Sequence, residues 1–176
     1  MVSGPGAGPA RTFVALDELI DEVGPDVARF FFLASGSGTH MDFDLDLAKE
    51  RSEKNPVYYV QYAHARIASL VKKAETLTQG SKGRTVKGEF GESERRLAAF
   101  LLRLPDVVED VARSYNVQQL PMYAMDLARA FHDYYDKARV IDNDVVNLTR
   151  LQLMRATQQV LKNTLALMGI AAPEKM

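Results

Sequence analysis

The chain has 176 residues, of which 47% are hydrophobic, and this is enough to build one packed domain. It contains no cysteine, which excludes disulfides and cysteine-ligated zinc, and no run of ~18 apolar residues of the kind that spans a membrane. We therefore expect a cytoplasmic protein. The net charge of −1 hides an asymmetry, because residues 1–50 carry a net charge of −6 and residues 51–176 a net charge of +5. The basic part suits a polyanion, although many ordinary domains carry such an excess.

The first fifty residues read as a tail followed by a connector. Residues 1–11 are rich in glycine and proline, which predicts a disordered linker or an expression remnant. Apolar spacing predicts a helix over Leu16–Val23, ended by Gly24, with Pro25 at the first position of the next helix. The three phenylalanines Phe30–Phe32 point around most of that helix, so we expect it to be buried on several sides or covered by a partner.

A second kind of pattern completes the connector, which we place at residues 12–50. Apolar and acidic residues alternate from Met41 to Leu47, and this period of two predicts an extended segment with one apolar face. The three aspartates do not form a calcium loop, because the turn glycine and the bidentate glutamate of such loops are missing.

Residues 51–176 show helical periodicity and no sign of paired strands. The predicted helices are Asn55–Thr78, Ser93–Asn116, Leu120–Ala138 and Thr149–Met168. Pro105 should kink or break the second helix, and Gly169 should cap the last one in the left-handed conformation. Gly80–Gly91 is predicted to be a flexible surface loop, and Val140–Asn147 a connection. The fold class is therefore all-α, an antiparallel helical bundle preceded by a short helical and extended connecting segment.

One helical face concentrates the side chains that suit RNA. After the Asn-Pro start signal at residues 55–56, Tyr59, Tyr62 and Arg66 are spaced i, i+3, i+7 and so share a face. Tyrosine rings are stacking platforms for unpaired bases, and an arginine adds a planar cation and phosphate contacts. The alternative is that these tyrosines are packing residues whose hydroxyl groups reach water.

The chain shows no signature of an active site. A di-metal site in a bundle needs a glutamate three residues before a histidine, and His40, His64 and His132 have none there. We interpret His64 and His132 as core or surface residues. The sequence also has no phosphate-binding loop, no G-x-G-x-x-G and no G-x-S-x-G motif. We therefore expect neither a bound metal nor a catalytic residue in these 176 residues.

Several separate segments, in order, resemble the arginyl-tRNA synthetase family, over roughly residues 12–176. The matching segments are Thr12–Gly24, Pro25–Phe31, Asp42–Ala48, Asn55–Arg66, Ala128–Tyr135, Arg139–Val140, Gln159–Asn163, Leu167–Ile170 and Pro173–Met176. The resemblance implies that residues 51–176 are the helical domain that holds the anticodon stem-loop of arginine tRNA. It also implies an ATP-dependent ligase as the parent enzyme. The H-I-G-H-like and K-M-S-K-S-like motifs of that enzyme are absent here, so we expect a fragment without the catalytic core, inactive alone and without a cofactor.

The resemblance also assigns roles to individual residues. It places Tyr59, Tyr62 and Arg66 beside the anticodon loop, Tyr135 on the facing helix, and the C-terminal Met176 against the loop. The predicted phosphate contacts of the same surface are Arg66, Arg139 and Lys162. The expected partners are arginine tRNA and the missing catalytic domain, with no membrane and no DNA. The competing interpretation is a helical protein-interaction module without RNA binding, which the Phe30–Phe32 run and the tyrosines would also suit.

Overall fold

The structure is a computed structural model that describes residues 15–36, 38, 41, 43–79 and 84–176. The predicted disordered tail, residues 1–11, lies outside the described residues, as do position 42 of the alternating segment and positions 80–83 of the predicted loop.

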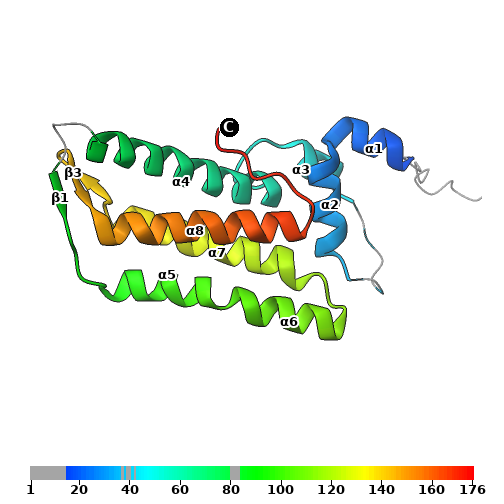
Figure 1. The fold of residues 1–176 in the computed structure, drawn as a ribbon. Helices are drawn as coiled ribbons and strands as arrows, with labels where there is room; N and C mark the ends of the chain where they lie inside the picture. Colours follow the sequence, from blue (N-terminus) through cyan, green and yellow to red (C-terminus); the bar gives the residue numbers. More distant parts are fainter. Residues whose placement is uncertain (1–14, 37, 39–40, 42, 80–83) are drawn as a thin grey trace, which may run out of the picture.

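The body of the molecule is an antiparallel bundle of long helices (Figure 1). Its members are α4 (Pro56–Gln79), α5 (Glu92–Leu102), α6 (Leu104–Ser114), α7 (Gln119–Lys137) and α8 (Leu148–Leu167). Helices α5 and α6 follow one another along one side, and α7 contacts each of the other members. The predicted all-α bundle is confirmed. The predicted break near Pro105 is also confirmed, because α5 ends at Leu102 and α6 begins at Leu104.

The apolar stripes meet in one continuous core. Val60, Ala63 and Ile67 of α4 are fully buried, as are Leu127 and Phe131 of α7. Leucines and Met154 of α8 close the core from the other side. Burial of this apolar surface is the main stabilising term and fixes which face of α4 and α7 remains outside.

The connector packs at one end of the bundle. Helix α1 (Leu16–Val23) has the predicted bounds, and α2 (Pro25–Ala34) begins at the predicted proline after Gly24, whose φ of +85° only glycine adopts easily. Of the three phenylalanines, Phe30 is in the core, whereas Phe32 is 47% exposed. Phe43 from the following segment lies 5.2 Å from Phe31 and 6.1 Å from Phe32, ring centre to ring centre.

The prediction of an extended segment up to Leu47 is wrong in its second half. Residues Leu45–Lys49 form a short helix, α3. The Asp44 carboxylate accepts a hydrogen bond from the backbone N–H of Leu47 at 2.9 Å, as an N-cap residue does. The spacing of the aspartates is typical of one face of a strand, but Asp44 is the N-cap of a helix.

The prediction that no strand follows residue 50 is also wrong. Strands β1 (Arg84–Val86), β2 (Ile141–Asp142) and β3 (Val145–Asn147) form a small sheet in the order β1-β3-β2 at the opposite end of the bundle from the connector (Figure 1). Strands β2 and β3 are antiparallel, and β1 joins β3 in parallel. The turn residues Asn143 and Asp144 have positive φ, as tight hairpin turns require. Part of the predicted loop and of the predicted connection is therefore paired backbone.

Two further features of the fold are the glycine that follows the last helix and the polarity of the described helices. Gly169 follows α8 with a φ of +68°, so the predicted left-handed cap is confirmed. None of the helices in the described part of the chain is both long and apolar enough to cross a lipid bilayer.

Candidate nucleic-acid interface

The start of α4 is held by a buried asparagine. The Asn55 side chain accepts hydrogen bonds from the backbone N–H groups of Val57 (3.0 Å) and Tyr58 (3.4 Å), so it caps the helix. Its amide nitrogen donates to the carbonyl oxygens of Ala48 (3.0 Å) and Glu50 (2.9 Å). One side chain therefore fixes the helix start relative to the connector, and with it the direction of the tyrosines that follow.

An aromatic cluster joins the outer faces of α4 and α7. We define it as Tyr58, Tyr59, Tyr62, His132 and Tyr135. Tyr59 and Tyr62 lie 4.9 Å and 6.2 Å from His132, measured between ring centroids. Tyr58 stacks on Tyr62 with an interplanar angle of 7° and a centroid distance of 6.3 Å. The structure thus brings together the tyrosines that the sequence placed on one face.

The tyrosines of the cluster differ in how much they offer to a ligand. Tyr62 is 40% exposed, whereas Tyr58, Tyr59 and Tyr135 are half-buried. Burial raises the pKa of the Tyr59 hydroxyl, with Arg129 opposing the shift and Asp133 adding to it. Tyr62 is therefore the most open stacking surface of the cluster, whereas Tyr59 packs against His132.

Arg66 lies between two rings of the cluster. Its guanidinium carbon is 4.2 Å from the centroid of the Tyr135 ring and 5.9 Å from that of Tyr62, so both contacts are cation–π interactions. None of the ion pairs among the described residues involves Arg66. The charge is held in place by aromatic faces and keeps its hydrogen-bond donors free of protein carboxylates.

An open hollow adjoins this arginine. The Arg66 hollow is lined by Arg66, Lys73, Tyr135, Arg139 and residues 141–144 of strand β2 and the turn after it. Arg139 is 81% exposed and lies 3.8 Å from the Asp142 carboxylate, an exposed pair of small energy that a phosphate could replace. The structure therefore brings Arg139 to the same side as Arg66 and Tyr135. Lys162 is exposed on α8 and lines neither this hollow nor the next one.

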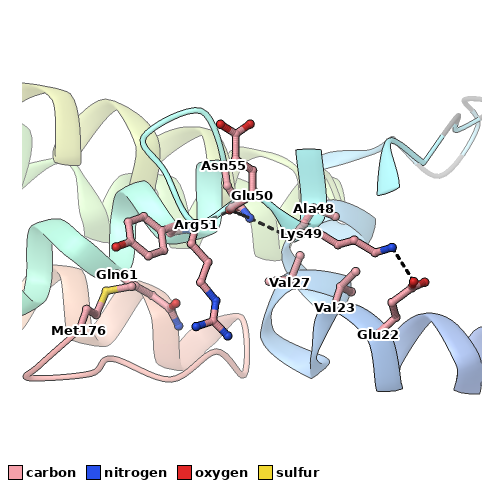
Figure 2. A pocket seen from close by; sticks show the side chains of 11 residues that line it. Glu22, Val23, Val27, Ala48, Lys49, Glu50, Arg51, Asn55, Gln61 and Met176 are labelled. Carbon is pink, nitrogen blue, oxygen red and sulfur yellow. Dashed lines mark hydrogen bonds and ion pairs between the residues drawn. The ribbon is translucent and has the colours of Figure 1, made fainter. Parts of the chain in front are cut away.

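The C-terminal segment crosses α4 and ends beside the cluster. Gln61 donates to the carbonyl oxygen of Ala171 (3.0 Å), and a ring nitrogen of His64 lies 2.8 Å from the carbonyl oxygen of Pro173. Met176 is 54% exposed and lines a second hollow with Arg51, Gln61 and Tyr58. Figure 2 shows Met176 next to Gln61, with the Arg51 side chain extending toward the C-terminal segment. His64 is a buried residue, as expected from the sequence.

Sequence reasoning missed two members of the cluster. Tyr58 is absent from the residues predicted to contact RNA, although its i, i+4 spacing to Tyr62 places both on one side of the helix. His132, which the sequence indicates is a core or surface residue, packs against Tyr59 and Tyr62 within the cluster. Its i, i+3 spacing to Tyr135 was the available signal. No group of three His, Asp or Glu side chains suited to a metal ion occurs among the residues that the structure describes.

Comparison with known proteins identifies relatives for most of the chain. The family model of the DALR anticodon binding domain matches residues 60–176. The arginine–tRNA ligase of Dehalococcoides mccartyi strain BAV1 is 47% identical over 166 residues, which are 93% of this chain and 30% of that protein. The chain thus spans about a third of the length of the curated relatives it matches.

Solved structures agree with this match. A crystal structure from Campylobacter jejuni superposes with a TM-score of 0.80 at 28% identity, over 97% of this chain and 37% of that chain. The arginyl-tRNA synthetase of Thermus thermophilus superposes with a TM-score of 0.65 at 30% identity, over 88% of this chain and 27% of that chain.

Proposed function

The chain belongs to the DALR anticodon-binding domain family, and we propose that it binds the anticodon stem-loop of arginine tRNA as the anticodon-reading part of an arginine–tRNA ligase. In this proposal the whole enzyme attaches arginine to its tRNA in the cytoplasm at the expense of ATP. Residues 51–176 form the tRNA-binding domain, and residues 12–50 connect it to the catalytic domain. The 47% identity to a curated arginine–tRNA ligase supports the choice of this enzyme over other ligases.

The observation that carries the proposal is the aromatic cluster with Arg66 packed between its rings. Tyr62 offers an exposed ring on which an unpaired base can stack, and Arg66 is fixed beside it with donors available to a phosphate. Tyr135 of the facing helix holds Arg66, and Tyr59 packs against His132 beside the pair. A surface of this kind suits single-stranded loops, whose bases are free to leave their own stack.

The remaining predicted contacts extend this surface on two sides. Arg139 and Lys73 would contact backbone phosphates from the Arg66 hollow, and Met176 would pack against the loop from the C-terminal segment. Lys162 is the outlier, because it lines neither hollow. We assign it only a long-range electrostatic contribution to binding.

A titration tests the proposal directly. The labelled anticodon stem-loop of arginine tRNA is titrated with the chain at low and at moderate salt, with a stem-loop carrying a different anticodon as control. We expect salt-dependent binding that prefers the arginine anticodon. Binding without preference would mean that the surface attracts RNA by its positive charge alone. No binding at either salt concentration would contradict the proposal.

One observation favours a second candidate, a protein-interaction surface. Phe32 is 47% exposed beside Phe43 at the connector end of the molecule. A contact of this kind would be hydrophobic and nearly independent of salt, in contrast to RNA binding. Concentration-dependent light scattering at high salt would detect such association between copies of the chain.

A further inference from the structure

His132 contains a polar atom that the fold leaves without a partner. Its Nε2 atom is buried and makes no hydrogen bond, and no hydrogen bond to either ring nitrogen of His132 occurs in the described part of the chain. The Nε2 atom of His64 is also buried and unpaired, but there the other ring nitrogen contacts the Pro173 carbonyl and so orients the ring. An unpaired buried polar atom lowers stability and calls for another explanation of the residue. At His132 the fold supplies none.

The close packing contacts of the His132 ring are with other aromatic rings. Phe131 and Tyr59 pack their rings against it with centroids at 5.1 Å and 4.9 Å. Tyr62 lies nearly parallel to it, at 6.2 Å and 19°. A phenylalanine would satisfy each of these contacts without an unpaired nitrogen. The presence of nitrogen atoms at this place is therefore unnecessary for packing.

The surroundings of His132 favour the neutral form of its imidazole. Burial lowers the pKa of His132, and the positive charge of Arg66 lowers it further, while Asp136 and Asp133 act in the opposite direction. A neutral imidazole has one nitrogen that donates and one that accepts a hydrogen bond. It can therefore read the edge of a base without adding a charge that would bind any phosphate equally well.

Access to this nitrogen is controlled by the exposed ring. Tyr62 is the most exposed ring of the cluster, and its centroid lies 6.2 Å from that of the His132 ring. Because the Nε2 atom of His132 is buried, a base reaches it only when the neighbouring Tyr62 ring rotates aside.

We propose that His132 is a base-reading residue, whose Nε2 atom forms a hydrogen bond with the edge of the unpaired nucleobase that binds beside Tyr62. The inference rests on the proposed function, since it assigns specificity within the same surface. The unpaired nitrogen then has its partner in the complex, and the stability lost in the free protein is the cost of the site's selectivity.

The test separates reading from packing with a double-mutant cycle. Wild type and His132→Phe are each titrated with the anticodon stem-loop and with stem-loops in which one loop base at a time is replaced by an abasic residue. We expect His132→Phe to unfold at the same temperature as wild type or higher, and to bind the intact loop about two- to tenfold more weakly. The loss should vanish for one abasic loop, because the read base is then missing. His132→Leu provides a second nitrogen-free variant if His132→Phe does not fold.

Each result decides the inference. If His132→Phe binds the intact loop as tightly as wild type, His132 reads no base, while the proposed function stands. If it loses affinity equally for every loop, including each abasic one, the residue acts through packing and the inference is overturned. If wild type itself does not bind the stem-loop, the proposed function fails, and the inference falls with it.

Discussion

The Arg66 guanidinium lies 4.2 Å from the centroid of the Tyr135 ring, so a cation of α4 and an aromatic ring of α7 hold one another across the helix pair. The arrangement orders a long flexible side chain before any ligand arrives. A preordered arginine loses less conformational entropy on binding than a free surface arginine. Arg66 therefore combines a phosphate-binding charge with a fixed position, which a lysine would not reproduce.

Substitution of Arg66 should separate these two contributions. Arg66→Ala should weaken binding of the stem-loop and reduce the slope of log K against log salt by about one phosphate contact. Arg66→Lys should keep most of the slope and still lose affinity, because the planar contact with Tyr135 is gone. The matched control is Lys72→Ala, an exposed cation of the same helix that lines neither hollow. Equal effects of Arg66→Ala and Lys72→Ala would show that only net charge matters.

The backbone at Arg139 is held by the ion pair between Glu94 and Arg150. The Glu94 carboxylate is 2% exposed and accepts a hydrogen bond from Arg150 at 2.9 Å, and Arg150 also donates to the carbonyl oxygen of Arg139. Glu94→Gln should destabilise the fold by about 1–3 kcal/mol, reduced from the value of fully buried pairs because Arg150 is 32% exposed. Glu92→Gln, at an exposed pair with Arg96, should cost less than about 0.5 kcal/mol. Urea unfolding of the three proteins measures both values.

The same carboxylate predicts a dependence on pH. Burial alone would raise the pKa of Glu94, but hydrogen bonds from the backbone and from Ser93, together with Arg150, outweigh it and lower the pKa. The stabilisation is therefore present above the ordinary pKa of a glutamate and is lost as the pH falls through the lowered value. We expect the difference in unfolding free energy between wild type and Glu94→Gln to be constant from pH 7 to about pH 5 and to shrink toward pH 3. A difference that grows on acidification would contradict this assignment.

Two glycines should resist substitution for different reasons. Gly24 has a φ of +85° and open space around it, whereas Gly169 has a φ of +68° and a Cβ there would lie 3.0 Å from the Arg29 side chain. Gly24→Ala should cost about 1–3 kcal/mol, because its φ of +85° with a ψ of 157° lies in a region that is nearly restricted to glycine, and Gly169→Ala should cost about 1–2 kcal/mol. Gly38 has neither a positive φ nor a close neighbour, so Gly38→Ala is the control and should be neutral or slightly stabilising. Thermal unfolding of the three variants gives the order.

The C-terminal segment should loosen when one carboxylate is removed. The Asp26 carboxylate accepts hydrogen bonds from the Ala171 N–H at 3.2 Å and from the Gln61 amide at 3.0 Å, and so joins α2, α4 and the segment. Asp26→Ala should speed hydrogen exchange at the Ala171 amide, with little change at buried amides in the middle of α4. Asp17→Ala, at an exposed position of α1, is the control. Unchanged exchange at Ala171 would mean that other contacts hold the segment.

The bundle could be predicted from the sequence because its signals are long and repeated. The apolar stripe of α4 continues for about five turns, and Pro105 and Gly169 mark helix ends through backbone chemistry that acts locally. The small sheet could not be predicted in this way. Its strands have two or three residues each, and β1 joins β3 from a distant part of the chain. Asn143-Asp144 was a turn signal, but the strands beside it are too short to show a period.

The candidate site was predicted in part for the same reason. Tyr59, Tyr62 and Arg66 lie on one helix, so their spacing alone places them together. The position of His132 among them depends on how α7 packs on α4, which no spacing along one helix reveals.

The alternation that ends at Leu47 was misleading, because Asp44 caps a helix instead of facing water on a strand. A cap and a strand face use the same residue type, and only the hydrogen bond distinguishes them.

The measurement that tests the central claim most directly compares Tyr62→Ala with Tyr62→Phe in binding to the arginine anticodon stem-loop. Tyr62→Ala removes the exposed ring, whereas Tyr62→Phe keeps the ring and removes only the hydroxyl. If a base stacks on this ring, Tyr62→Ala should raise the dissociation constant about 5- to 150-fold, and Tyr62→Phe should change it by less than about threefold. Tyr62→Ala binding as tightly as wild type would contradict the account of this face as an anticodon reader.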